Sequence, residues 1–358
     1  MKCMLLSLFW ALLVPFTVSA NESCTPPHAV ILMYHHVSDQ TPASTSVSPT
    51  IFKEHLEFLA EHDFKVMDLI TVVSKLRQGE SLPDSVVVLT FDDGYESVYT
   101  EAFPLLKKLG WPFTVFVCPE AINKRQGPVA TWDQLREMSN SGATIASHGL
   151  NHEFMTRPRP DEDSELHLRR LERELVYAQK QLVDQHLGEA NLLAFPFGEY
   201  SPSVQTVVQR LNLTAFGQHS GAVGPNSDLT CLPRFPMAAD FASLDGFGDK
   251  VSSLPFPTAM VNRMDPNLDV ETAASAAPVL TLILESACLG EGEVLAYASG
   301  QGRISCNWLD RQSGFLQIQA PNPLPRGRSR YNVTAPVPGT SRWFWFSQLW
   351  IVGQEHQY

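Results

Sequence analysis

Short apolar runs alternate with amphipathic stretches along the first two thirds of the chain. Six runs have the length and composition of buried strands, namely residues 29–37, 85–94, 112–119, 142–149, 191–198 and 213–221. Four stretches between them show helical spacing of apolar residues, namely 52–61, 98–109, 132–141 and 161–187. Strands that alternate with helices form parallel sheets, and short continuous apolar strands suit a sheet covered on both faces. We therefore predict an α/β fold, in which six successive units favour a β/α barrel, complete or incomplete, over an open sheet.

The pattern changes after residue 237, where helical spacing disappears. Apolar and polar positions alternate in runs separated by glycine and proline, namely residues 278–287, 293–300, 302–309, 314–320 and 341–352. Alternation of this kind is typical of strands with one buried face. We predict a small all-β, sandwich-like module over residues 255–358, which follows a first domain over residues 21–254.

Aromatic residues crowd the last of these runs. In a strand, Trp343 and Trp345 would lie on one face, and Phe344 and Phe346 on the other. Packing in a sandwich core and stacking against sugars both explain the cluster, so a carbohydrate-binding role of the module stays open.

The first twenty residues have the features of a secretory signal peptide. A lysine precedes an apolar run, and the segment ends in the small residues Val18, Ser19 and Ala20. An N-terminal membrane anchor is the alternative, although the run is shorter than the ~20 residues that a spanning helix needs. No later segment is long enough, so we predict no membrane span and export to the periplasm, the cell envelope or the extracellular space.

Export allows disulfides to form. Removal of a signal peptide would leave five cysteines, of which Cys288 and Cys306 are close in sequence. We predict a disulfide between these two. Cys118 lies inside an apolar run and is expected to be a small core residue.

Composition narrows the class of partner. The chain has 358 residues, 44% of them hydrophobic, and a formal charge of -12. Phosphate backbones require a concentrated basic surface, so this charge argues against nucleic acid as a partner.

Polar residues follow three of the predicted strands directly. Asp92 and Asp93 end one run, His148 and His152 follow another, and a Pro-Phe-Gly segment follows a third. The carboxyl ends of parallel strands share one edge of the sheet, where ligands bind. On a helical turn the four-residue spacing places both imidazoles on one face, where a carboxylate could complete a metal site. Exposed helix histidines and a simple Asp-Gly turn are the alternatives when each motif is taken alone.

Together, the segments LTFDDG and SHGLNH resemble the polysaccharide deacetylase family, also called the NodB-homology group or carbohydrate esterase family 4. The resemblance covers about residues 29–236 and implies a distorted (β/α)7 barrel. The segment ILMYHHVSD is similar to the subgroup that acts on poly-N-acetylglucosamine or related exopolysaccharides. The resemblance implies that Asp93, His148 and His152 bind a divalent metal, zinc first, with nickel, cobalt or iron as alternatives. It also implies that Asp92 is the general base.

The third motif of the family corresponds here to Pro196, Phe197 and Gly198. We expect these residues to contact the substrate, with the backbone N–H of Phe197 donating to the oxyanion. Many members carry an arginine before this motif that orients the aspartate base. The preceding residues in this chain are Leu193 and its apolar neighbours, so that arginine is absent from its usual place.

A late Leu-x-x-His segment, which supplies the general acid in many members, is also not recognisable. His35 is our candidate for this role, because it follows Tyr34 at a strand end on the expected catalytic edge. Tyr34 is expected to contact the substrate. His36 and His219 are the alternatives for the acid, and each is also explained as a structural or surface histidine.

These features predict a secreted, metal-dependent deacetylase that removes N-acetyl groups from an N-acetylhexosamine polysaccharide or oligosaccharide. An O-acetyl esterase acting on xylan or peptidoglycan is the alternative, because the same site cleaves esters. A carbohydrate-binding protein with a degenerate site is a third hypothesis, against which the intact Asp-Asp and His-His pairs argue.

Overall fold

The computed structural model describes residues 24–188, 191–261, 265–268 and 277–353. The predicted signal peptide, residues 1–20, lies outside these ranges. Within them, no helix combines the length and the apolar composition that crossing a membrane requires.

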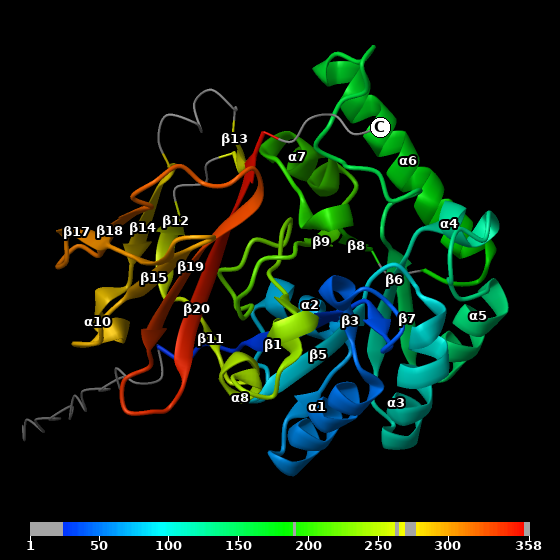
Figure 1. The fold of residues 1–358 in the computed structure, drawn as a ribbon, viewed down its shortest axis with the longest axis horizontal. Coiled ribbons are helices and arrows are strands. Elements are labelled where there is room, and N and C mark those ends of the chain that lie inside the picture. Colours follow the sequence, from blue (N-terminus) through cyan, green and yellow to red (C-terminus); the bar gives the residue numbers. More distant parts are fainter. Residues whose placement is uncertain (1–23, 189–190, 262–264, 269–276, 354–358) are drawn as a thin grey trace, which may run out of the picture.

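A curved parallel sheet forms the first part of the molecule (Figure 1). Its order is β10-β1-β5-β6-β7-β8-β9, and β4 pairs with the beginning of β5. The strands are β1 Ala29–Tyr34, β4 Lys65–Val66, β5 Val86–Phe91, β6 Phe113–Val117, β7 Ala143–Ser147, β8 Leu192–Ala194, β9 Thr214–Phe216 and β10 Phe235–Pro236. Each of the six predicted strand runs contains one of them. A later segment pairs with β9 in parallel through Leu232, whose N–H donates to the Ala215 carbonyl at 2.8 Å, before the chain enters β10 beside β1.

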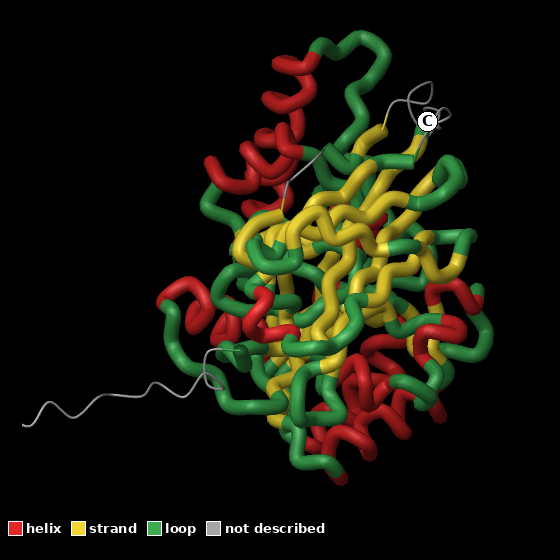
Figure 2. Tube along the Cα trace, turned by 90° about the vertical axis from the view of Figure 1, so that its left-hand side faces the viewer, coloured by secondary structure: helices red, strands yellow, loops and turns green. Residues whose placement is uncertain are grey.

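Helices lie around the outside of the strands (Figure 2). They are α1 Pro49–Glu61, α2 Leu69–Gln78, α3 Phe103–Leu109, α4 Pro119–Asn123, α5 Trp132–Asn140, α6 Ser164–Asp184, α7 Pro202–Arg210 and α8 Phe247–Val251, with one π-helical turn, Val98–Ala102, before α3. Their ends follow local capping chemistry. Asp163, for example, accepts a hydrogen bond from the N–H of Leu166 and starts α6. The predicted α/β barrel architecture is confirmed.

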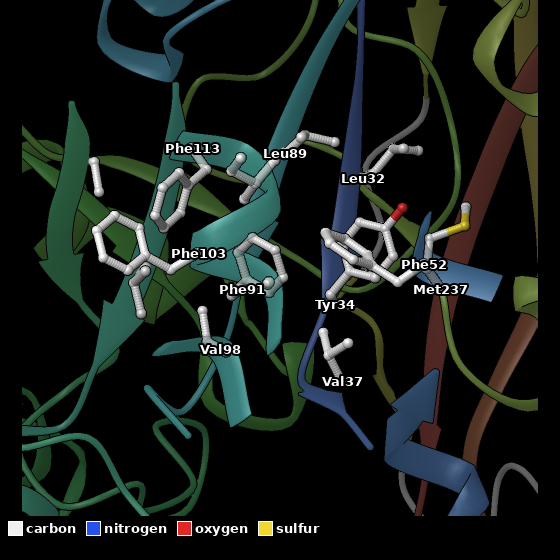
Figure 3. Packing of buried hydrophobic residues seen from close by; sticks show 14 of the residues in the cluster. Leu32, Tyr34, Val37, Phe52, Leu89, Phe91, Val98, Phe103, Phe113 and Met237 are labelled. Atoms are coloured by element: carbon white, nitrogen blue, oxygen red, sulfur yellow. The ribbon is translucent and has the colours of Figure 1, made fainter. Parts of the chain in front are cut away.

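The space between the sheet and α1 and α3 is filled by large apolar side chains (Figure 3). Phe91 of β5 stacks on Tyr34 of β1 at 5.4 Å, and Phe113 of β6 meets Phe91 edge-on at 5.8 Å. This core holds β1, β5 and β6 in register, so the residues that follow these strands emerge on one edge.

The C-terminal region consists of two sheets in which most neighbouring strands are antiparallel. One has the order β11-β20-β19-β15-β16 with β13 on β20, and the other has the order β12-β14-β18-β17. The strands are β11 Leu254–Pro255, β12 Thr258–Val261, β13 Asn267–Leu268, β14 Val279–Leu284, β15 Leu295–Ala298, β16 Gly302–Ile304, β17 Cys306–Asp310, β18 Phe315–Gln319, β19 Gly327–Pro336 and β20 Trp343–Val352, with the short helix α10 Ser286–Leu289. The predicted all-β region is confirmed, and it includes β19, which the sequence patterns did not reveal. The division at residues 254 and 255 remains a prediction.

Five short pieces complete the described elements. They are the two-residue strands β2 His36–Val37 and β3 Ser46–Val47, which pair in parallel, and the 3-10 turns Ala43–Thr45, Pro196–Gly198 and Ala239–Ala242. The turn at Pro196–Gly198 is the predicted third motif.

Packing accounts for much of the C-terminal aromatic cluster. Phe344 and Trp350 are fully buried in the core between the two β-sheets. Trp345 points the other way and packs edge-on against Phe235 of the barrel, with ring centroids 5.1 Å apart. Opposite faces of β20 therefore serve two different cores.

The predicted disulfide is wrong. Cys288 bonds to Cys24, which lies 264 residues earlier, and Cys306 is not in a disulfide. Proximity in sequence was misleading because β15 and β16, which separate Cys288 from Cys306, belong to the other sheet. The observed bond attaches the start of the described chain to the β module.

Candidate active site

The two aspartates of the DDG segment take different positions at the end of β5. Asp92 continues the sheet, since its N–H donates to the Tyr34 carbonyl at 2.9 Å. Asp93 has a φ of 70° and Gly94 a φ of 64°, so the chain turns sharply at the end of β5. A Cβ on Gly94 would lie 2.7 Å from a methyl group of Val117, which explains the glycine. The turn sends the two carboxylates to different partners.

Asp92 is fully buried and binds a fully buried arginine. The two terminal nitrogens of the Arg234 guanidinium, Nη1 and Nη2, each donate to one oxygen of Asp92 at 2.7 Å. Arg234 also donates to the Gly217 carbonyl at 3.0 Å and to the Thr90 hydroxyl at 3.2 Å. Burial alone would raise the pKa of Asp92, but Arg234 together with His148 and His35 outweighs it and holds this pKa below its usual value. Asp92 is therefore a carboxylate with a fixed orientation.

Asp93 faces two imidazoles. The Nε2 atoms of His148 and His152 lie 3.3 and 3.2 Å from the same oxygen of Asp93. One ligand atom from each of the three residues lies within 4.8 Å of the others. Burial favours a raised pKa for Asp93, but the two imidazoles outweigh it and keep the pKa of this carboxyl well below its usual range.

The spacing of the two histidines predicts a shared helix, but the structure shows none there. His148 follows β7, with its N–H bonded to Val117 of β6, and the chain then forms an irregular loop. Gly149 and His152 both have positive φ angles, 80° and 58°. These two left-handed residues fold the loop back, so the rings meet with centroids 4.9 Å apart. The residues are those predicted, but the local conformation is different.

The donor set fits a divalent cation. Nδ1 of His148 lies 2.8 Å from the Ala194 carbonyl, which places a proton on Nδ1, so in the neutral ring Nε2 carries the lone pair that can bind a cation. That Nε2 atom is buried and has no hydrogen-bond partner. An unpaired lone pair that faces a carboxylate requires positive charge between them. Two imidazoles and one carboxylate are the ligand types that zinc and neighbouring first-row ions accept.

The third motif lies against this cluster. Phe197, at a φ of 59°, places its ring 4.5 Å from the His152 ring and stacks on Phe154 at 3.9 Å. Pro196 and Gly198 are buried, whereas Phe197 is partly exposed. Of the three predicted contact residues, Phe197 is therefore the one whose side chain solvent reaches.

Tyr34 points into the barrel core, which does not fit the substrate contact that we expected. It is fully buried in the barrel core beside Phe52 and Phe91 (Figure 3). Its hydroxyl lies 3.1 Å from Nδ1 of His55. The residue ends β1 on the expected edge, but its side chain points between the sheet and α1. Its position at a strand end did not determine its direction.

The three histidines considered for the acid lie in different places. Burial lowers the pKa of His35, while the charges of Asp92 and Asp93 oppose this effect, so His35 lies within their field. His36 stacks on Tyr95 at 3.5 Å. His219 lies beyond Arg234 and lines a cavity of about 340 Å³ between the barrel and the β module. Of the three, His35 has the strongest electrostatic link to both aspartates.

A family model described as "Polysaccharide deacetylase" matches residues 79–216. This span contains Asp92, Asp93, His148, His152 and the third motif. The chain contains a polysaccharide deacetylase domain of the NodB type.

Curated relatives of this deacetylase domain include two proteins named poly-beta-1,6-N-acetyl-D-glucosamine N-deacetylase. The one from Escherichia coli K12 is 30% identical over 143 residues, which cover 35% of this chain and 21% of the relative. The one from Staphylococcus aureus MRSA252 is 25% identical over 228 residues, covering 61% and 78%. The chain also matches 59% of the length of the Bacillus subtilis protein YxkH. It thus spans less than two thirds of two of these relatives.

Solved structures share the fold of the deacetylase domain. The Streptococcus pyogenes deacetylase PplD, in complex with acetate, is 25% identical with a TM-score of 0.54, covering 60% of this chain and 95% of that one. IcaB from Ammonifex degensii is 20% identical with a TM-score of 0.54, covering 64% and 97%.

Arg234 is the residue of the deacetylase site that sequence reasoning missed. It lies outside the matched span and 142 residues from Asp92. One feature of the sequence could have revealed it: Arg234 is the single charged residue of the apolar segment CLPRFPM. A charge in such a segment requires a buried partner. The contact of Arg234 with Asp92 is the one that we expected from an arginine before the third motif.

Proposed function

We propose that this chain is an exported, metal-dependent N-deacetylase that acts on an N-acetylhexosamine polysaccharide, with poly-β-1,6-N-acetylglucosamine as the first candidate. One observation carries the proposal: two neighbouring carboxylates have different partners. Asp93 faces two histidines, and Asp92 is held ionised by Arg234. The names of the Escherichia coli and Staphylococcus aureus relatives support the choice of glycan.

Each residue has a defined part in the proposed hydrolysis. Asp93, His148 and His152 hold the divalent ion, which when bound acidifies water and polarises the acetyl carbonyl. Asp92 accepts the proton of the attacking water. The N–H of Phe197 donates to the acetyl oxygen as negative charge develops there.

Departure of the amine completes the proposed reaction. His35 donates a proton to the amide nitrogen while the C–N bond breaks, which releases acetate and leaves a free amine on the sugar. Arg234 keeps Asp92 in one orientation throughout, because its four hydrogen bonds leave the guanidinium no freedom to turn.

The proposed compartment is outside the cytoplasm. The sequence of residues 1–20 supports it, and so does the disulfide between Cys24 and Cys288, because disulfides persist in oxidising compartments.

Acetate release tests the proposal. Purified protein is incubated with glycans of defined linkage, N-acetylated or O-acetylated, with and without a chelator. We expect acetate from N-acetylated β-1,6-linked hexosamine, abolished by chelation and restored by zinc. Faster release from O-acetylated xylan or peptidoglycan would favour the esterase hypothesis, and glycan binding without any release would favour a binding protein.

A matched pair of variants tests the role of the base. Asp92→Asn should keep its metal content and lose about 10²- to 10⁴-fold in kcat, because a general base contributes about that much. Asp245→Asn makes the same chemical change at an exposed position and should retain full activity. Equal activity of the two variants would remove Asp92 from the mechanism.

A further inference from the structure

Strand β19 of the C-terminal module reaches the loops of the catalytic edge. Arg328 donates from Nη1 to the carbonyl of Phe197 at 2.6 Å, and Arg330 donates from Nη2 to the carbonyl of Gln218 at 2.8 Å. The two arginines are two residues apart in one strand and therefore project from the same face. Both acceptors are main-chain atoms in loops that follow β8 and β9. The module thus binds the backbone of the deacetylase domain beside its site.

Phe197 is the residue whose conformation most needs such support. It has a φ of 59° and a ψ of 0°, a left-handed conformation that bulky residues rarely adopt. Such strain persists where surrounding contacts over-determine it. On one side its ring packs against Phe154 and His152. From the module, the guanidinium of Arg328 lies 5.8 Å from the ring centroid and also binds the carbonyl.

Arg328 has a like-charged neighbour on β19 and a main-chain carbonyl as its hydrogen-bond partner. Burial lowers the pKa of Arg330, and the neighbouring charge of Arg328 lowers it further, so the two cations repel each other. Among the residues that the structure describes, no carboxylate lies within ion-pair distance of Arg328. The carbonyl of Phe197 is therefore the polar partner that holds this guanidinium in place.

We propose that Arg328 is a positioning residue of the deacetylase site, through which the β module holds Phe197 in its left-handed conformation against His152. This gives the module a role in building the active site, separate from glycan binding. The expected effect of Arg328 on turnover rests on the proposed function. Its expected effect on the order of the loop around Phe197 rests on the loop contacts alone.

Three variants of the full-length protein test it. Arg328→Ala removes both the hydrogen bond and the guanidinium over the ring, while Arg328→Lys keeps one donor. Arg303→Ala is the control, because Arg303 is an exposed arginine of the same module that pairs with Glu293. Each variant is measured for kcat and KM on N-acetylated glycan, for the melting temperature, and for hydrogen exchange of the peptide covering residues 195–201.

We expect Arg328→Ala to speed exchange in residues 195–201 by about tenfold and to lower kcat by about tenfold, since a hydrogen bond to a charged group is worth about that factor. KM should change less than about threefold, because a loss confined to the transition state leaves substrate binding intact. Arg328→Lys should recover part of both effects, and Arg303→Ala should match wild type.

Two results would overturn the proposal. One is exchange and kcat in Arg328→Ala that match those of Arg303→Ala. The other is a uniform rise in exchange across both domains with a lower melting temperature, which would show a general structural role. Absence of acetate release by the wild-type protein on every glycan would refute the proposed function instead, and the exchange measurement would still decide whether Arg328 orders the loop.

Discussion

The buried pair of Asp92 and Arg234 makes the sharpest prediction. Both side chains are 0% exposed and are joined by two hydrogen bonds of 2.7 Å. Arg234→Gln removes the cation and leaves Asp92 as a buried carboxylate without its partner. Breaking a buried pair from one side costs about 3–5 kcal/mol, a large part of the ~5–15 kcal/mol that a folded domain has.

A double-mutant cycle measures this coupling by urea unfolding at neutral pH. Arg234→Gln should lower the free energy of unfolding by about 3–5 kcal/mol. Asp92→Asn combined with Arg234→Gln leaves no unpaired charge, so the double variant should lose about 2 kcal/mol less than the sum of the single variants. The exposed pair of Lys53 and Glu57 is the control, with an expected coupling below about 0.5 kcal/mol.

The same variants connect stability to turnover. At a temperature where Arg234→Gln is folded, kcat should fall by about 10²-fold or more, because the carboxylate that takes the proton has lost its fixed orientation. Additive losses in the cycle, or a loss below about 1 kcal/mol for Arg234→Gln, would show that the pair does not hold the site as we argue.

Three further predictions concern other parts of the molecule. His35→Gln should lower kcat by about 10²-fold or more with the metal content unchanged, and steady-state rates within threefold of wild type would exclude His35 as the acid. Burial lowers the pKa of His55 from 6.5 to about 4. Between these two pH values His55 therefore binds a proton in the unfolded chain but not in the folded chain. Stability should therefore fall by about 3 kcal/mol as the pH drops from 6.5 to 4, and His55→Asn should flatten this slope in urea unfolding, whereas an unaltered slope would assign it to other groups. Replacing Cys24 and Cys288 by serine should cost up to about 5 kcal/mol, because the bond closes a long loop, while Cys306→Ser should change nothing; peptide mapping that found Cys306 in a disulfide would contradict this.

Local patterns in the sequence predicted the barrel and most of the residues that meet at the candidate site. The strand runs and helical stretches follow from the periodicity of apolar residues, which each segment carries by itself. Asp92, Asp93, His148 and His152 could be placed at one edge because all strands of a parallel sheet end there. The order of the strands is enough to place these four residues together.

The direction of single side chains and loops was beyond such patterns. Tyr34 was placed at the right strand end, but packing against Phe91 turned it into the core. The two histidines meet through left-handed residues in a loop, where helical spacing suggested a helix. Both errors come from short segments whose conformation is decided by the surfaces around them.

What the sequence by itself determined is which chemical groups follow which strands. What only the tertiary structure decided is which distant groups complete them: Arg234 for Asp92 across 142 residues, Cys24 for Cys288 across 264, and Arg328 for Phe197 across 131. The physical reason is that periodicity acts over a few residues, whereas a partner for a buried charge or a strained peptide is selected by packing, wherever along the chain it lies.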